Sequence, residues 1–419
     1  MGRVSGSRDR RRHVFASAAA RVLAISVFLR IVLDTAIQMF SPFFSLIAAG
    51  AQLSTTALGQ MIALRNLTGL TAPLFGAWAL RFGYLRIIQG GLVGAGLGLL
   101  LIASASASGR WTMAAGLLLL GFGMVAVGPS LYSHLSEQSP YSQRARYLGT
   151  LECSRAIAGI VGLSAVGWWM ERAGWNAPFL LLGLLLVGAA GAVPFMASPN
   201  PSTAKATDAL PRRQMTLSAG LAYLETSGTL VPTLGLIALN ALNLFAATQL
   251  TIVHGAWLNE HFAFGPSALG LSAILLGLAD LCGDGFVALF GDRVGIQRCL
   301  RGATLLSLLA FGLAATAPSA SPLALLTLAS IRFCSEIAFT SGQALLSELV
   351  PEIRALLIST SSSVLLLFGG AGAALGPWVF ARWGIAGVGG VSASAVALAS
   401  LASLLLVHLR QPTGAVLER

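Results

Sequence analysis

Three pairs of ionisable side chains lie inside otherwise apolar stretches of this sequence. The pairs are Arg30 with Asp34, Asp280 with Asp284, and Arg332 with Glu336. Each pair has a spacing of four residues, which places both side chains on one face of a helix. A carboxylate in apolar surroundings can take up and release a proton as water reaches it and leaves it, and a guanidinium can hold an anion through paired hydrogen bonds. These residues are therefore candidates for proton transfer and for ligand binding.

Structural roles compete with these functional ones. The two pairs that join an arginine to an acid could neutralise themselves and fix the rotation of their helices. Asp280 and Asp284 carry like charges and have no cation beside them in the sequence, so Arg65 is considered as their partner. The role of these two acids stays open.

Uncharged polar side chains add to the candidates for a substrate path. Gln38 lies one helical turn beyond Asp34, and Asn240 and Asn243 lie in a second apolar stretch. Such side chains can orient a solute through hydrogen bonds, although each can equally be satisfied by its own helix.

The composition around these residues is that of a membrane protein. Of the 419 residues, 56% are apolar and 10% are charged, and the mean hydropathy is +0.80. A soluble domain carries about 25% charged residues. The apolar residues come in runs of about 20, which is the length that a helix needs to cross a bilayer. The net charge of +11 does not indicate nucleic-acid binding, because the charges fall singly or in short loops without interleaved aromatic residues.

Twelve apolar runs can be placed along the chain, in two groups of six. The first group lies near 22–49, 55–79, 87–107, 112–135, 151–170 and 176–197. The second group lies near 229–256, 267–291, 299–317, 322–347, 356–381 and 384–408. We therefore expect an all-α integral membrane protein with twelve transmembrane helices in two bundles, 22–197 and 229–408. The remaining segments are a basic N-terminus, 1–21, a polar linker, 198–228, and a tail, 409–419.

The basic residues orient these helices, because cytoplasmic loops carry the excess of arginine and lysine. With the N-terminus inside, 19 of the 26 basic residues fall on the cytoplasmic side and four lie within or at the edge of helices. Only Arg110, Arg172 and Arg382 fall outside. The sequence therefore predicts a multi-pass protein of a bacterial-type cytoplasmic membrane, with both termini in the cytoplasm.

Two short loops repeat each other at half the length of the chain. They are GAWALRFGYLR after the second run and ALFGDRVGIQR after the eighth. Arg81 corresponds to Arg293, and Gly83 to Gly295, at a constant offset of 212 residues. Internal repeats of this kind are typical of secondary transporters, whose substrate site lies between the repeats.

These loops resemble the hallmark loop of the major facilitator superfamily, G-x-L-A-D-R-x-G-R-K-R. The second copy keeps the core of the motif as Asp292, Arg293 and Gly295, with Ala288 in place of the leading glycine. The first copy departs further, because Leu80 replaces the acid. The resemblance covers the whole chain through the twelve runs, the linker and the repeat. It implies the family's fold of two pseudo-symmetric six-helix bundles.

The resemblance also implies positions for the candidate residues. In the family, spans 1, 4, 7 and 10 surround the central cavity, so the two arginine–acid pairs are expected near the substrate path. The acid of the hallmark loop closes the cytoplasmic side against the start of a helix in the opposite half. For Asp292 that helix is the fifth span, near Arg155. The remaining residues of this expected gate are Arg81, Gly83, Arg293 and Gly295.

The implied function is secondary active transport of a small organic solute by alternating access. Proton-coupled export is favoured by the likeness to bacterial efflux members. The alternative is import of a small organic anion, with Arg30 and Arg332 as the binding cations. The antiporter pattern G-x-x-x-G-P lies in the eleventh run, from Gly372 to Pro377, rather than in the fifth, and this weakens the assignment to drug antiporters.

The expected partners are a small-molecule substrate, the lipid bilayer and protons. We expect a monomer with no cofactor, no metal and no bound nucleic acid. The only lysine, Lys205, lies in the linker without a glycine-rich loop before it, so a P-loop is absent. An intramembrane hydrolase remains as an alternative because GLSA, with its potential serine nucleophile, occurs at 162–165 and 270–273. HExxH does not occur, and the two serines are better explained as small residues at helix contacts, so we expect no enzyme.

Overall fold

Helices are the only regular secondary structure in the part of the chain that the computed structural model describes, residues 5–105, 109–138, 144–197, 217–350 and 353–404. Within this part, eight helices are long and apolar enough to cross a membrane, and a shorter apolar helix, Ala177–Ala190, accompanies them. The prediction of an all-α membrane protein is therefore confirmed. Three stretches of the predicted connecting segments, 1–4, 198–216 and 409–419, lie outside the described residues.

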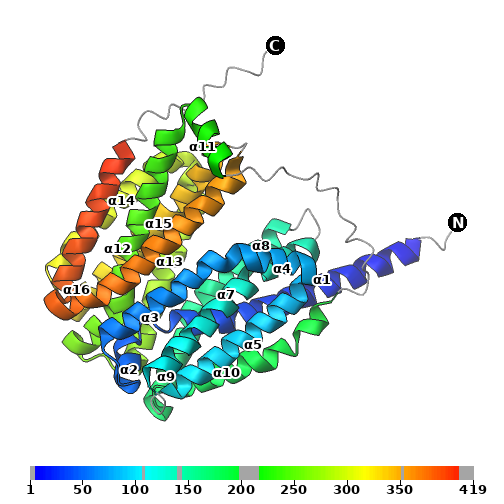
Figure 1. Ribbon diagram of the computed structural model, residues 1–419, viewed down its shortest axis with the longest axis horizontal. Helices are drawn as coiled ribbons and strands as arrows, with labels where there is room; N and C mark the ends of the chain where they lie inside the picture. The colour runs from blue at the N-terminus through cyan, green and yellow to red at the C-terminus, as the bar shows by residue number, and fades with distance from the viewer. Residues whose placement is uncertain (1–4, 106–108, 139–143, 198–216, 351–352, 405–419) are drawn as a thin grey trace. The chain divides into compact units, whose positions relative to one another are not determined.

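Six of the predicted spans are continuous helices, which Figure 1 labels along the chain. In the first half they are α5 (Tyr84–Ala103) and α7 (Arg110–Gln138). In the second half they are α12 (Leu230–Phe262), α13 (Pro266–Val294), α14 (Ile296–Ala315) and α15 (Ser321–Leu349). The end of α12 lies beyond the predicted end at 256, because helical hydrogen bonding continues through polar residues that a hydropathy pattern does not count.

The first two predicted spans are interrupted helices. The first contains α1 (Ser5–Gln38) and α2 (Phe44–Gly50). A turn that includes Pro42 separates them, since proline has no N–H to continue a helix. The second contains α3 (Thr55–Leu67), the 3-10 turn η1 (Thr68–Thr71) and α4 (Ala72–Phe82).

Threonine side chains saturate backbone groups at the break in the second span. The hydroxyl of Thr68 donates to the carbonyl of Arg65, and that of Thr71 donates to the carbonyl of Thr68, each at 2.6 Å. Carbonyl groups at a helix end have no partner within the helix, and in hydrocarbon no water can replace one. The Thr68 hydroxyl adds to the bond that the Thr68 N–H already donates to the Arg65 carbonyl, so this carbonyl is fully satisfied at the break.

The remaining spans are also divided. The fifth consists of α8 (Arg144–Ile157), the π-helical turn η3 (Ala158–Gly162) and α9 (Leu163–Ala173). The sixth consists of α10 (Ala177–Ala190) and η4 (Val193–Met196). The last two lie in α16 (Arg354–Leu404), which is divided at Gly384, where φ is 61° and ψ is −160°. Helices thus occupy all twelve predicted spans, and an additional helix, α11 (Leu217–Thr226), lies in the predicted linker.

The helices are grouped in two compact units. The first is Met1–Leu210 with Ala263–Ile274, and the second is Pro211–Phe262 with Leu275–Arg419. In the first unit, α5 packs against α7 and α10, and α1 packs against α8. In the second, α14 packs against α15 and the last span, and α12 packs against the eleventh span. The same span pairs are in contact in both halves, as two pseudo-symmetric bundles require, while the exact bundle boundaries stay a prediction.

The two repeated loops have the same backbone conformation. Gly83 has φ 91° and ψ 141°, and Gly295 has φ 91° and ψ 125°. Each N–H donates at 2.9 Å to the carbonyl four residues earlier, that of Ala79 or Gly291. Only glycine adopts this conformation without strain, so the glycine that the repeat aligns is the residue that turns the chain between one helix and the next.

A second repeated turn follows the fifth and the eleventh spans. The guanidinium of Arg172 lies 4.0 Å from the ring centroid of Trp168, and that of Arg382 lies 3.9 Å from that of Trp378. Two residues after each arginine, the chain turns at a glycine of positive φ, which is 89° at Gly174 and 61° at Gly384. Both tryptophans are exposed. The hydropathy pattern does not predict this repeat.

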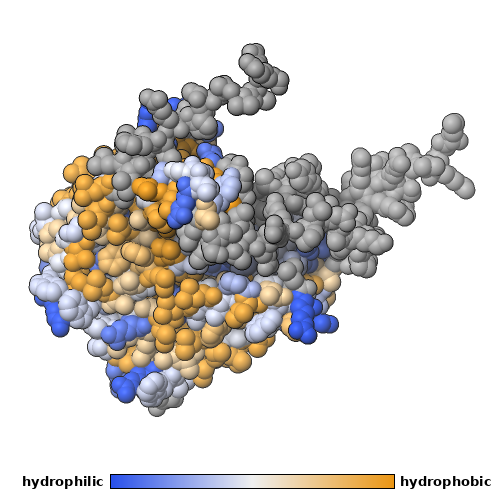
Figure 2. Space-filling view, turned by 45° about the horizontal axis from the view of Figure 1, so that its top comes forward, coloured by the Kyte–Doolittle hydropathy of each residue, from blue (hydrophilic) through white to orange (hydrophobic). Residues whose placement is uncertain are grey.

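The protein surface is mostly apolar over the helices. Figure 2 shows hydrophobic side chains covering most of the coloured surface, with hydrophilic residues gathered in separate patches. Exposed leucines such as Leu74, Leu289 and Leu309 contribute to this surface. Apolar side chains on this scale are stable against lipid but not against water.

Candidate functional site

The Arg30–Asp34 pair lies on α1 in the first unit, as the spacing of four residues predicts. Arg30 Nε donates to Asp34 Oδ2 at 2.7 Å, and the two side chains are 16% and 11% exposed. The Arg30 guanidinium also lies 5.5 Å from the ring centroid of Tyr132 on α7. The same guanidinium therefore contacts the carboxylate and the aromatic face at once.

Gln38 joins α1 to the fifth span. Its Nε2 donates to the carbonyl of Arg155 at 3.1 Å. A side chain on Gly159 would meet the Gln38 amide oxygen, and one on Gly162 would overlap Thr35. The glycines of η3 therefore let the fifth span approach α1 closely, which places two predicted site residues, Gln38 and Arg155, in contact through the Arg155 backbone.

Arg65 lies in the first unit where α3 passes into η1, and it is only 7% exposed. Its Nε and Nη2 donate to Asn66 Oδ1 at 3.4 and 3.1 Å, and its guanidinium lies 5.5 Å from the ring centroid of Phe40. Within the second unit, Asp280 is held by Arg332 on α15, and a pairing of Arg65 with Asp280 or Asp284 stays a prediction.

Arg332 is the centre of a charge cluster in the second unit. Its Nε donates to Asp280 Oδ1 at 2.8 Å, and its Nη2 donates to Asp280 Oδ2. Its Nη1 donates to Thr251 Oγ1 at 3.2 Å, whereas the oxygen of Glu336 lies 3.8 Å from Nη2. The cluster therefore joins α12, α13 and α15. The partner expected from the spacing of four residues, Glu336, is secondary to Asp280, because two parallel hydrogen bonds are stronger than one long contact.

Asp284 lies one turn further along α13 and has a different partner. Its Oδ1 accepts a hydrogen bond from Thr340 Oγ1 at 2.6 Å. Gly283, between the two acids, approaches the backbone of α15, where a Cβ would lie 2.8 Å from the Phe333 carbonyl. Because Gly283 has no side chain, α13 and α15 can pack closely. Asp280, Asp284 and Glu336 therefore lie in one cluster with Arg332.

The two asparagines predicted for the substrate path are buried on α12 but have different surroundings. Asn243 Nδ2 donates to the carbonyl of Leu239 at 3.0 Å and to Thr304 Oγ1 on α14 at 3.5 Å. The Asn240 amide packs against Gly342 on α15, and neither of its polar atoms has a hydrogen-bond partner among the described residues. Hydrogen bonds to α12 and α14 therefore explain the burial of Asn243, whereas no such bonds explain the burial of the Asn240 amide.

The predicted gate residues lie at the two repeated loops. Asp292 and Arg293 are exposed at the end of α13, and Arg81 is exposed at the end of α4. Gly83 and Gly295 form the turns described above. The contact of Asp292 with the fifth span stays a prediction.

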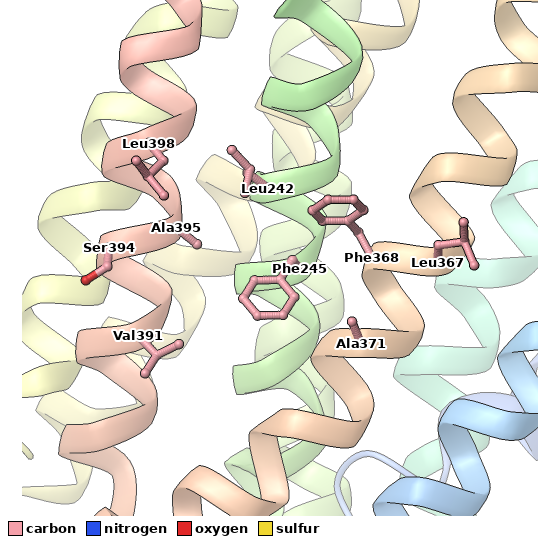
Figure 3. A pocket seen from close by; sticks show the side chains of 9 residues that line it. All are labelled: Leu242, Phe245, Leu367, Phe368, Ala371, Val391, Ser394, Ala395 and Leu398. Atoms are coloured by element: carbon pink, nitrogen blue, oxygen red, sulfur yellow. The ribbon is translucent and has the colours of Figure 1, made fainter. Parts of the chain in front are cut away.

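A separate pocket of about 540 Å³ opens between α12 and both arms of α16 (Figure 3). Phe245 and Phe368 project into it from the two helices, and Leu398 lines its far side. The one hydroxyl in its wall, that of Ser394, donates to the carbonyl of Gly390. This pocket can accept hydrocarbon, but it offers no group that would bind a charged solute.

Comparison with known proteins adds a family and a fold. The family model described as the Major Facilitator Superfamily matches residues 26–256. No curated protein matches the sequence. The fold is similar to a bacterial homologue of the human lysosomal transporter Spinster, with a TM-score of 0.70 and 14% identity over 93% of this chain and 95% of that one. It is also similar to the nucleoside transporter NupG, with a TM-score of 0.74 and 14% identity over 93% of this chain and 99% of that one.

Proposed function

Because this chain belongs to the Major Facilitator Superfamily, a family of membrane transporters, we propose that it exports a small organic solute by alternating access, driven by the entry of protons. The observation that carries the proposal is the buried Arg30–Asp34 pair, whose side chains are 16% and 11% exposed. An ionisable pair inside a membrane is costly and is by default functional. Export as the direction rests only on the resemblance to bacterial efflux members stated from the sequence.

Asp34 is the proposed proton carrier. A proton on this carboxylate removes the charge that holds Arg30, whose guanidinium then keeps its contact with Tyr132, 5.5 Å away. Loss of the proton restores the hydrogen bond at 2.7 Å. The two protonation states therefore favour two side-chain arrangements on α1, which is what coupling between a proton and a conformational change requires.

Import of an organic anion is the second candidate function. It relies on Arg30 and Arg332 as binding cations, and each of these arginines is held by a carboxylate, that of Asp34 or Asp280. An anion would have to displace an acid that is already in place. This observation favours the proton-coupled role for the two clusters.

Purified protein in liposomes with an entrapped pH indicator tests the proposed function. A solute that is transported should cause proton movement in the opposite direction, and an imposed pH gradient should drive the solute against its concentration. Solute flux that is indifferent to the pH gradient would identify a facilitator and would reject proton coupling.

The proposed topology places both termini in the cytoplasm, with the protein a monomer in the cytoplasmic membrane. In a variant without native cysteines, a single cysteine at Thr207 should react with an impermeant reagent only from inside, and one at Asn259 only from outside. The native residues must be removed first because Cys153 and Cys282 are exposed. Labelling of either position from the opposite side rejects the topology.

Asp292 is the proposed latch of the cytoplasmic side. An anion beside a helix N-terminus gains about 0.3–1 kcal/mol, and up to about 2 kcal/mol when partly buried. Loss of about 1.4 kcal/mol shifts a two-state equilibrium about tenfold. Asp292→Asn should therefore move the resting population towards inward-facing and slow transport, whereas Leu80→Ala should change little. Spin-label distances across the cytoplasmic faces measure the shift, and identical distributions for wild type and Asp292→Asn would leave the loop with only a topogenic role.

A further inference from the structure

The arginines inside the membrane-spanning segments differ in whether an acid neutralises them. Arg30 is paired with Asp34, and Arg332 is paired with Asp280. Arg65 is more deeply buried, at 7% exposure, and no carboxylate described in its own unit lies within ion-pair distance of it. An arginine stays charged in a protein interior, so this cation is left without a counter-charge in the most costly environment of the molecule.

The contacts of Arg65 orient its guanidinium but do not saturate it. The Asn66 amide oxygen accepts from Nε and Nη2 on one edge, and the ring of Phe40 lies 5.5 Å away. Nη1, at the other edge, has no hydrogen-bond partner among the described residues. The edge formed by Nη1 and the second N–H of Nη2 is therefore a fixed pair of donors with nothing to bind.

The surrounding backbone keeps Arg65 in this position. Its own carbonyl accepts from Thr68, and α7 approaches through Gly121, where a Cβ would lie 2.9 Å from Arg65 Cγ. The stem of the side chain is thus enclosed between α3 and α7 at the break in the second span. A side chain that is fixed along its length and unsatisfied at its tip is prepared for a ligand, since the entropic cost of ordering it has already been met.

We propose that Arg65 binds the carboxylate of the transported solute, which is therefore an organic anion. This proposal rests on the proposed transport function and specifies its substrate class. A carboxylate accepts two parallel hydrogen bonds from one edge of a guanidinium, which matches the free edge of Arg65. The solute neutralises Arg65, so the proton-carrying pair at Arg30 and Asp34 is left intact.

Binding to the purified full chain tests the proposal without any transport measurement. The probes are organic carboxylates, each beside its uncharged amide, beginning with benzoate and benzamide and with hexanoate and hexanamide. Carboxylates should raise the melting temperature saturably and the amides should not. Arg65→Gln should weaken that binding about 10–100-fold, as expected when one partner of a charged hydrogen bond is lost, and Arg65→Lys should weaken it less. Arg86→Gln, which removes an exposed arginine of equal charge, should change nothing.

The ligand-free melting temperature separates a binding role from a structural one. An arginine that is kept for a ligand destabilises the empty protein, so Arg65→Gln should leave the melting temperature unchanged or raise it. A lower melting temperature together with unchanged carboxylate binding would overturn the proposal. So would the absence of binding by every carboxylate, or equal stabilisation by chloride or inorganic phosphate, which would identify an inorganic counter-ion. If carboxylate binding depends on Arg65 but the liposomes show no proton coupling, the proposed proton-coupled transport is rejected and the binding role of Arg65 stands.

Discussion

Asp34→Asn is expected to reduce pH-gradient-driven accumulation to the level of liposomes without a gradient, while solute exchange stays measurable. Asparagine keeps the shape of the side chain and can still accept from Arg30, but it cannot carry a proton. Exchange across the membrane needs only the substrate-loaded protein to alternate, so it survives the loss of the carrier. The measurement compares gradient-driven uptake with counterflow of the same solute in the same vesicles.

Two controls distinguish proton transfer from a structural salt bridge at this position. Glu225→Gln changes an exposed acid on α11 and should leave both activities intact. If the pair only fixes the helix, Asp34→Asn should instead lower expression and melting temperature, and the double variant Arg30→Gln with Asp34→Asn should restore them. Accumulation that persists in Asp34→Asn would eliminate Asp34 as the proton carrier.

Asp280→Asn is expected to destabilise the protein more than Glu336→Gln does. Asp280 accepts two hydrogen bonds from Arg332, whereas Glu336 lies 3.8 Å away. Removing one partner of a fully buried pair costs about 3–5 kcal/mol. We expect roughly 1–3 kcal/mol for Asp280→Asn, because the Arg332 and Asp280 side chains are 26% and 19% exposed and partly screened.

Thermal unfolding in detergent measures this difference. Asp284→Asn is the matched control on the same helix, since an amide oxygen can still accept the hydrogen bond from Thr340, and its effect should be the smallest. Arg332→Lys should retain part of the stability that Arg332→Gln loses, because a lysine replaces the charge but not the paired geometry. A larger effect of Glu336→Gln than of Asp280→Asn would show that the pair on one helix is the stronger one.

Hydropathy and glycine placement were enough to predict the main features of the fold. A helix in lipid must be long and apolar along its whole length, so α5, α7 and α12 to α15 appear in the sequence as unmistakable runs. The aligned Gly83 and Gly295 predicted matching turns, since the positive φ of both residues leaves little choice of side chain. Both features depend only on residues within the same stretch of chain, so the sequence of that stretch is enough to predict them.

The partners of the charged residues could not be predicted in the same way. The spacing of Arg332 and Glu336 predicted a pair within one helix, yet the stronger partner, Asp280, comes from a different helix. The packing of α13 on α15 decides this, through Gly283 and Phe333. A count of charges in neighbouring spans would have suggested the pair, because Arg332 and Asp280 both lie near the middle of their spans and have opposite charges.

The breaks inside spans were also missed, for a related reason. An apolar run does not reveal whether its backbone hydrogen bonds continue, and the hydroxyls of Thr68 and Thr71 compensate the break in the second span without changing its hydropathy. The sequence signal was present in Pro42 and Pro73, which cannot donate to a preceding carbonyl. Proline alone does not predict a break, however, because Pro129 and Pro377 lie inside helices that continue through them.

The stacked pairs Trp168–Arg172 and Trp378–Arg382 have a consequence for the lipid around the protein. A tryptophan ring that carries a cation on its face is too polar for the hydrocarbon core and too apolar for bulk water. Such a pair is therefore most stable at the level of the lipid headgroups. The two pairs end corresponding helices, so each marks the height of the headgroups on its own bundle. A bilayer that is too thin or too thick for that height must deform or tilt the helices, at a cost of a fraction of a kcal/mol per ångström of mismatch. The free energy of the protein in its membrane therefore depends on the thickness of the bilayer.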